Sequence, residues 1–371
     1  FWTAQYAPYI GGVEVMATAL VAGLRERGHD VCVVTSHGDL ELPDVAHVEG
    51  VPVHRFDFHG AIARRDLEKI VQVRRRLVEL KRTFRPDLIH LNITEPSFLF
   101  HYQTLDAWPA TMVVTLPVFV PEGTTAKDSL LGRAFQDAAW VIAPSMAVLR
   151  DTHQLVPGIA PRSSVIYNGL EMPRLNPGPI PFDPPRILAI GRVVEEKGFD
   201  TAISAFARIR RRFPRARLVV AGDGPARKAL ERQAAELGIS YAVDFLGWIA
   251  PRDVPRLIAA STMVLQPSRW REAFGLVALQ AGQMARPAVS TTTGGIPEVV
   301  VDGETGLLVE PDDPAALADA MAYLLDHPDV AARMGAAGRQ RALTFTMERH
   351  VTEHDALYRQ LVKENAHAVS A

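Results

Sequence analysis

The stretch that decides the fold runs from Glu272 to Glu298 and reads EAFGLVALQAGQMARPAVSTTTGGIPE. The apolar segment that ends at Pro267 and Ser268 has the pattern of a buried strand, and the apolar run after Gly275 predicts a helix packed on a sheet. A helix that begins directly after a glycine presents free backbone N–H groups and the positive end of its dipole to a bound group. The stretch therefore predicts an anion site with the Glu272 carboxylate beside it.

Seven motifs follow one another along nearly the whole chain. They read PYIGGVE near the start, VIYNG at 165–169, GRVVEEKG at 191–198, VVAGDGP at 219–225, VDFLGW at 243–248, the Glu272 stretch, and DGETGLLVEPDDPAAL at 302–317. In these motifs the chain resembles the retaining glycosyltransferases of family 4, which have the GT-B fold. The signature of that family is a Glu, seven residues and a second Glu, and this chain carries Gln280 at the second place.

Strands and helices alternate along the chain, which is the pattern of parallel α/β sheets. One series covers residues 1–170 and a second covers residues 186–344. The segment 171–185 contains six prolines and is predicted to be a linker, because proline fits neither a helix interior nor a central strand. The resemblance implies two facing Rossmann-like domains with a cleft at the carboxyl ends of their strands, and a helix in residues 345–371 that crosses back onto the N-terminal domain.

Composition excludes several classes of protein. The 371 residues carry a formal net charge of −2, whereas a general nucleic-acid binder is usually strongly basic. Cys32 is the only cysteine, so the chain forms no internal disulfide framework or thiolate zinc site, and a reducing, cytoplasmic setting is the default expectation. No apolar run reaches the roughly 18 residues that a membrane span needs, and no signal peptide is recognised.

Two basic residues follow the predicted strand RILAIG. Arg192 supplies a planar fork for phosphate oxygens and Lys197 a point charge, so together they would neutralise a diphosphate. Surface pairing with Glu195 or Glu196 is the alternative. No Asp-x-Asp sequence occurs and the histidines lack zinc-ligand spacing, so we expect a metal-independent site and no cofactor.

The resemblance assigns roles around the donor. Glu272 would accept hydrogen bonds from the sugar and orient its ring, and Gln280 would bind the ribose hydroxyls. The other contacts are placed at Gly12, Gly275 and Leu276 for the diphosphate and at Phe274 for the sugar. Family members often have a histidine next to the donor sugar where this chain has Pro117, a departure that bears on which sugar is used.

Three other positions have two interpretations each. Trp248 follows a predicted strand and is either a core residue, which its residue type favours, or a side chain that stacks on the nucleobase. Asp312 and Asp313 precede Pro314 and a predicted helix, so helix capping explains them better than metal binding does.

The stretch from Arg64 to Arg85 carries nine Lys or Arg residues against three acids. Its apolar positions predict a helix packed on the N-terminal sheet with the arginines outside; they are Leu67, Ile70, Val71, Leu77, Leu80 and Phe84. A solvated face is the favoured interpretation. The alternative is attraction to an anionic membrane surface at the inner face of the membrane, or to an acidic acceptor.

Together these features predict a metal-independent, retaining hexosyltransferase that uses a UDP- or GDP-sugar. The acceptor is not specified by the sequence, and a glycan, a lipid-linked sugar and a small molecule all stay open. Two alternatives also remain: a sugar-nucleotide epimerase or hydrolase on the same fold, and a non-catalytic subunit that binds the donor.

Overall fold

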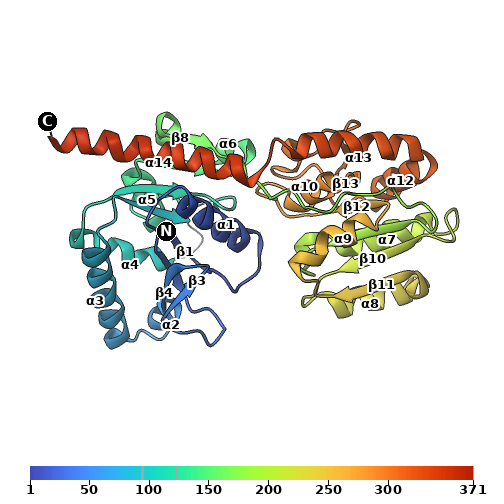
Figure 1. Ribbon diagram of the computed structural model, residues 1–371. Coiled ribbons are helices and arrows are strands. Elements are labelled where there is room, and N and C mark those ends of the chain that lie inside the picture. Colours follow the sequence, from blue (N-terminus) through green and yellow to red (C-terminus); the bar gives the residue numbers. More distant parts are fainter. Residues whose placement is uncertain (93–95, 122, 371) are drawn as a thin grey trace. The chain divides into compact units, whose positions relative to one another are not determined.

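The computed structural model describes residues 1–92, 96–121 and 123–370 and divides the chain into two compact units. The N-terminal unit comprises Phe1–Gly169 with Met347–Ala371, and the C-terminal unit comprises Leu170–Thr346 (Figure 1). Ala371, the last residue of the predicted returning segment, lies outside the described residues. Each unit is an α/β domain built on a mainly parallel sheet, as the alternation of strands and helices predicts.

The N-terminal sheet has eight strands among the described residues, in the order β3-β4-β2-β1-β5-β6-β7-β8. Neighbouring strands are parallel except for the antiparallel pair β3 and β4. The strands are β1 (Trp2–Thr3), β2 (Val33–Ser36), β3 (Val45–Val48), β4 (Val51–Phe56), β5 (Leu88–Asn92), β6 (Thr111–Thr115), β7 (Trp140–Ala143) and β8 (Ser163–Val165). The helices are α1 (Gly12–Glu26), α2 (Phe58–Ala63), α3 (Leu67–Phe84), α4 (Leu99–Tyr102), α5 (Leu130–Asp137), α6 (Met146–Leu155) and α14 (Met347–Ser370).

The β3–β4 hairpin is absent from the sequence prediction. Its turn is formed by Glu49 and Gly50, both with positive φ (50° and 78°), as a two-residue hairpin turn requires. Buried Val51 and Val53 alternate with partly buried Pro52 and His54, so the alternating valines were the signal of a strand in the sequence.

Helix α14 returns to the N-terminal unit and packs on α1 (Figure 1). The two helices approach closely at Gly23, where an added Cβ would lie 2.6 Å from a methyl group of Val351. The Tyr358 hydroxyl pairs with His90 Nδ1 in β5, and His29 Nε2 lies 2.5 Å from a carboxylate oxygen of Asp355. The returning helix is therefore fixed by both close packing and buried polar contacts.

The structure of helix α3 differs in part from the prediction for the basic stretch from Arg64 to Arg85. Val73 and Leu77 are buried, but Leu67 and Val71, which were expected in the core, are 75% and 58% exposed. Lys81, expected outside, is buried, because its ammonium donates to the carbonyls of His101 (3.3 Å) and Thr104 (3.0 Å). These carbonyls offset part of the cost of burying the charge, and burial still lowers the pKa of Lys81 to about 8; the helical period alone does not reveal either effect.

The C-terminal sheet has six parallel strands within the described part of the chain, in the order β11-β10-β9-β12-β13-β14. The strands are β9 (Arg186–Ile190), β10 (Arg217–Ala221), β11 (Val243–Gly247), β12 (Met263–Gln266), β13 (Ala288–Thr291) and β14 (Gly306–Val309). The helices are α7 (Phe199–Ile209), α8 (Arg227–Glu236), α9 (Val254–Ala259), α10 (Leu276–Gln283), α11 (Ile296–Val299), α12 (Pro314–Asp326) and α13 (Pro328–Ala342). The central strands are apolar and almost fully buried, which is typical of a sheet covered on both faces.

Helix α10, which follows Gly275, packs against α13. At Gly282 an added Cβ would lie 2.8 Å from the carbonyl oxygen of Gly338, so the two helices cross with their backbones nearly in contact. Part of the proline-rich segment also packs on this unit. Buried Arg286 donates to the carbonyls of Gly178 (3.1 Å) and Pro179 (3.3 Å).

Candidate functional site

Three loops of the C-terminal unit meet at the carboxyl edge of its sheet. They follow β9, β12 and β13, which are neighbours in the sheet. Ligands of open parallel sheets bind at this edge. The first loop carries Arg192 and Lys197, and the second carries Glu272 and leads into α10.

The Glu272 carboxylate links the loop after β9 to the loop after β12. Its Oε1 accepts a hydrogen bond from the Lys197 ammonium at 2.5 Å and from the Ser268 hydroxyl at 2.6 Å. The Glu272 side chain is 16% exposed and that of Lys197 is 32% exposed, so the ion pair is partly withdrawn from water yet reachable from it. The structure thus brings together two residues that lie far apart in the sequence and that were predicted to bind different parts of one donor.

Glycines allow these loops to approach one another closely. Gly198 has φ +65°, and a Cβ there would lie 1.9 Å from the carbonyl oxygen of Pro267. At Gly294 an added Cβ would lie 2.1 Å from the Glu272 carbonyl oxygen, which also accepts a hydrogen bond from Gly295 N at 2.8 Å. The backbone that carries Glu272 is consequently fixed from both sides.

The start of α10 presents backbone N–H groups after a glycine cap. Gly275 caps the helix with φ 115°, a conformation that favours glycine. Buried Gln266 accepts a hydrogen bond from Ala278 N at 3.0 Å, so one early N–H of the helix is satisfied from inside the protein. The earlier N–H groups, including that of Leu276, have no carbonyl partner within the helix and provide the positive end of its dipole.

The other predicted site residues have different surroundings. Arg192 is exposed in the loop after β9, and Gln280 is half-buried on α10. Gly12 begins α1 of the N-terminal unit. Phe274 is only 2% exposed and packs edge-on against Phe345 with ring centroids 5.3 Å apart, so its ring belongs to the core, and the contact of this residue with the sugar stays a prediction.

Trp248 also differs from the favoured interpretation. Its side chain is 62% exposed beyond the end of β11, which overturns the assignment to the core and leaves base binding as a prediction. Asp313 caps α12 through Ala315 N and Ala316 N, both at 2.9 Å, as predicted. Asp312, by contrast, pairs with Arg269.

Three functional candidates escaped the sequence prediction: Gln266, Ser268 and Arg269. A polar residue that closes an apolar strand, as Gln266 does, was the available signal for the first. Ser268 precedes Glu272 by four residues, a spacing that only the fold makes meaningful. Among residues 1–92, 96–121 and 123–370, no group of three or more His, Cys, Asp or Glu side chains is placed to hold a metal ion.

Two family models match the chain. The family model described as Glycosyltransferase Family 4 matches residues 10–174, and the model described as Glycosyl transferases group 1 matches residues 176–341. The glycogen synthase of Mycobacterium tuberculosis is 29% identical over 91% of this chain and 88% of its own length.

Two further similarities are more limited. The GDP-mannose-dependent alpha-(1-6)-phosphatidylinositol monomannoside mannosyltransferase of Mycolicibacterium smegmatis is 37% identical over 43% of this chain, and the match spans only 44% of that protein. The structure of Anabaena HepE in complex with UDP-glucose superposes with a TM-score of 0.72, covers 99% of both chains and is 20% identical, which shows a shared fold. No helix in the described ranges is long and apolar enough to cross a membrane. The two family matches lie end to end along the chain, which therefore belongs to the family 4 glycosyltransferases and has the GT-B fold.

Proposed function

We propose that this glycosyltransferase moves a sugar from a UDP- or GDP-sugar to an acceptor hydroxyl with retention of anomeric configuration and without a metal ion. The observation that carries the proposal is the contact between Lys197 and Glu272 in front of the start of α10. A cation, a carboxylate and free helix N–H groups at one edge match the diphosphate and the sugar of such a donor.

Lys197 is able to serve both anions at once. An ammonium has three donors, of which Glu272 Oε1 occupies one at 2.5 Å. The remaining donors are available for a phosphate oxygen, and Arg192 is exposed in the same loop. The same ammonium would then hold the diphosphate and keep the Glu272 carboxylate facing the sugar.

The chemistry follows from where charge develops. The bond between the anomeric carbon and the diphosphate oxygen breaks, and the diphosphate leaves with the electron pair. The acceptor oxygen bonds to that carbon from the same face, and its proton passes to an oxygen of the leaving diphosphate. Fixed positive charge from Lys197, Arg192 and the helix start stabilises the leaving group more in the transition state than in the ground state. Glu272 orients the ring and its negative charge favours an oxocarbenium-like state.

Two similar proteins support a nucleotide-sugar donor. One similar protein is named for dependence on GDP-mannose and another was solved with UDP-glucose, so both bases belong in the test. A thermal-shift screen should include UDP, GDP and their common sugars. A ligand at about 100 times its dissociation constant adds roughly 2.7 kcal/mol to stability. Lys197→Ala and Arg192→Ala should lose that shift, and a wild-type protein that no nucleoside diphosphate stabilises would overturn the proposal.

Product analysis then distinguishes transfer from its alternatives. Incubation of the stabilising donor with a panel of acceptor alcohols, followed by NMR of the anomeric proton, should give a glycoside with the configuration of the donor. An isomerised donor would indicate an epimerase, and free sugar alone a hydrolase. An unchanged donor that still stabilises the protein would indicate a donor-binding subunit.

We also propose that α3 contacts an anionic membrane surface. Exposed Leu67 and Val71 lie on the same helical face as exposed Arg74 and Arg75, an arrangement suited to an interface. Arg76 contributes less, because it pairs with Asp44 at 2.6 Å. Charge reversal at Arg74 and Arg75 should abolish co-sedimentation with phosphatidylserine vesicles at low salt.

The matched control reverses Arg208 and Arg211, which are exposed on the C-terminal unit. This variant has the same net charge as the α3 variant, so it should still co-sediment. Equal loss in both variants would show an effect of net charge alone, and wild-type protein that fails to co-sediment would leave α3 as a solvated face.

A further inference from the structure

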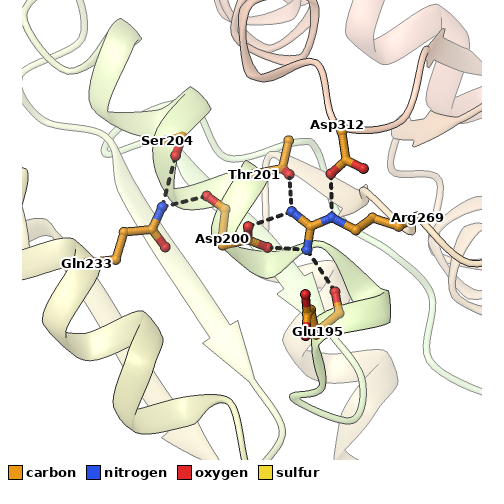
Figure 2. Close-up of polar contacts among 7 residues, drawn as sticks. All are labelled: Glu195, Asp200, Thr201, Ser204, Gln233, Arg269 and Asp312. Atoms are coloured by element: carbon orange, nitrogen blue, oxygen red, sulfur yellow. Dashed lines mark hydrogen bonds and ion pairs between the residues drawn. The ribbon is translucent and has the colours of Figure 1, made fainter.

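Arg269 connects four segments of the C-terminal unit through a single guanidinium (Figure 2). Nη1 donates to Asp200 Oδ1 at 2.8 Å and to the Glu195 carbonyl oxygen at 2.9 Å. Nη2 donates to Asp200 Oδ2 at 2.5 Å and to Thr201 Oγ1 at 3.2 Å, and Nε donates to Asp312. An arginine has five N–H donors, so this side chain has none left for a ligand.

Two of the segments that Arg269 connects belong to the candidate site. Glu195 belongs to the 3₁₀ turn Glu195–Lys197, whose last residue supplies the ammonium that contacts Glu272. Asp200 lies in the first turn of α7, directly after that 3₁₀ turn. Arg269 itself adjoins Ser268, whose hydroxyl bonds to Glu272.

The backbone of Arg269 reinforces the same link. Its N–H and that of the next residue, Trp270, both donate to the Glu196 carbonyl oxygen, at 2.9 and 3.2 Å. The turn that carries Lys197 is therefore fastened to the segment before Glu272 by main chain and by side chain. The carboxylates of Asp200 and Asp312 raise the pKa of Arg269, so the guanidinium stays charged at any working pH.

An ordinary surface salt bridge would not need this construction. An exposed ion pair contributes little to stability, and one carboxylate would suffice for it. Here the Arg269 side chain is only 26% exposed and satisfies two carboxylates, a hydroxyl and a carbonyl that lie in separate segments. This arrangement fixes the distance between the turn that carries Lys197 and the loop that carries Glu272.

We propose that Arg269 is a positioning residue that holds the Lys197 turn against the Glu272 loop, so that the ammonium faces both the carboxylate and the donor diphosphate. The inference rests on the proposed function of that site. It gives Arg269 no contact with the substrate.

The first test is Arg269→Lys. Lysine keeps the positive charge but has three donors on one atom, so it cannot span acceptors in three directions. The backbone hydrogen bonds to Glu196 remain, which favours correct folding. Asp200→Asn provides a second variant that weakens the same link from its other end. We expect a loss in kcat/KM of about 10- to 100-fold, together with weaker binding of UDP or GDP.

Gln233→Ala is the matched control. The Gln233 amide donates to the Asp200 carbonyl oxygen and to Ser204 Oγ, both at 2.9 Å, so it supports the same part of α7 from the side opposite to Arg269 (Figure 2). Its removal deletes two hydrogen bonds near Asp200 without touching the Lys197 turn. It should lower the melting temperature but leave nucleotide affinity and kcat/KM unchanged.

A double-mutant cycle with Lys197→Ala separates positioning from simple stabilisation. If Arg269 acts through Lys197, Arg269→Lys should have almost no further effect on nucleotide affinity in the Lys197→Ala background. Additive losses, or wild-type affinity in Arg269→Lys, would overturn the inference.

Hydrogen exchange of residues 193–198 provides a readout that needs no nucleotide. Exchange there should rise in Arg269→Lys and Asp200→Asn and stay unchanged in Gln233→Ala. If this pattern appears while wild-type protein binds no nucleoside diphosphate, the proposed function fails and the positioning of Lys197 stands. If residues 193–198 exchange alike in all variants, the positioning inference fails whatever the ligand.

Discussion

In the C-terminal unit the loops at the carboxyl edge of the sheet approach one another backbone against backbone at several glycines, in addition to the Arg269 contacts, whereas in the N-terminal unit side chains hold the loops that contain Ala7 and His37. Glycines make the first arrangement possible, since an added Cβ at Gly198, Gly222 or Gly294 would lie 1.9, 1.8 or 2.1 Å from a carbonyl oxygen. In the N-terminal unit, buried Arg55 donates to the Ala7 carbonyl at 2.8 Å, and the Tyr9 hydroxyl donates to the His37 carbonyl at 2.8 Å.

This difference explains why the sequence motifs are easier to recognise in the loops of the C-terminal unit. A backbone contact needs glycine at a fixed place, so the loops of the C-terminal unit keep a readable sequence pattern. Side-chain contacts tolerate many solutions, and the loops of the N-terminal unit expose apolar residues such as Ile10, Leu40 and Val118, whose identities are not constrained by the backbone. The loops of the C-terminal unit are therefore easier to recognise in the sequence than those of the N-terminal unit.

The units also differ in their buried titratable groups. Of the twelve histidines, only His327 lies between Leu170 and Thr346. In the N-terminal unit, His90, His350 and His354 are buried between β5 and α14, with ring centroids 5.9 Å apart for His90 and His354 and 4.4 Å apart for His350 and His354. Burial lowers the pKa of His350 to about 4 and lowers the pKa of the other two well below the ordinary value.

The largest expected effect is acid lability confined to the N-terminal unit. A histidine in the unfolded chain titrates near pH 6.5, whereas the buried ones stay neutral down to about pH 4, so between these values the unfolded state binds more protons. Stability is complete above pH 6.5 and falls as the pH drops. At pH 5.5 each histidine costs about 1.4 kcal/mol, or about 4 kcal/mol for the three.

Hydrogen exchange at pH 7.5 and 5.5, corrected for intrinsic rates, would test this prediction. Peptides from α14 and β5 should lose protection, while those from β9 and β12 should not. The double variant His350→Gln/His354→Gln should flatten the pH dependence by about half, because His90 remains and so does His101, a fourth buried histidine whose pKa burial lowers to about 3. Equal loss of protection in both units would contradict the assignment to these histidines.

The next effect concerns the backbone packing of the C-terminal unit. Gly198→Ala combines positive φ with a 1.9 Å approach to the Pro267 carbonyl oxygen, so we expect a loss of at least about 3 kcal/mol in the free energy of unfolding. Gly303 and Gly28 have similar φ (+74° and +87°), but nothing lies within 4 Å of an added Cβ. Alanine at these controls should cost about 1–2 kcal/mol each. Urea unfolding of the three variants measures the difference. Equal losses would show that the strain of an alanine at positive φ, and not the close backbone packing, causes the loss of stability.

The fold was more predictable than the details of the site for physical reasons. The strands of the C-terminal unit are short, mainly apolar runs, several of them followed by glycine or proline, so their positions were clear from the sequence. The burial of Lys81 was not, because it depends on carbonyls at His101 and Thr104 that the helical pattern does not contain. Arg269 was missed for the same reason, since its five acceptors come from three other segments.

A third prediction concerns whether the partly buried Glu272 carboxylate of the candidate site acts in the reaction. Glu272→Ala should lower turnover about a hundredfold or more, roughly 2.7 kcal/mol, because its interactions with the sugar strengthen as charge develops. Affinity for the bare nucleoside diphosphate should change little. Initial rates and calorimetry give the two quantities. A variant with normal turnover would place the catalytic role elsewhere.

The smallest effect is expected at Gln280, where the chain departs from the family signature. A carboxylate accepts hydrogen bonds from both ribose hydroxyls with charge assistance, whereas an amide offers one acceptor oxygen and an NH₂ group that needs its own acceptor. Charged hydrogen bonds contribute about 1.5–3 kcal/mol and neutral ones about 0.5–1.5 kcal/mol, so the difference is about 1 kcal/mol. Gln280→Glu should therefore bind the donor about fivefold more tightly and remain active.

Two controls make this small change interpretable. The deoxyribose form of the donor lacks one of the hydroxyls, so the advantage of Gln280→Glu should shrink with it if the ribose is the partner. Gln283, on the same helix, donates instead to the carbonyls of Leu170 and Glu171, so Gln283→Glu should not tighten donor binding. Tighter binding in both variants would point to a general charge effect on α10, and a dead Gln280→Glu beside an active Glu272→Ala would show that the two positions have exchanged roles.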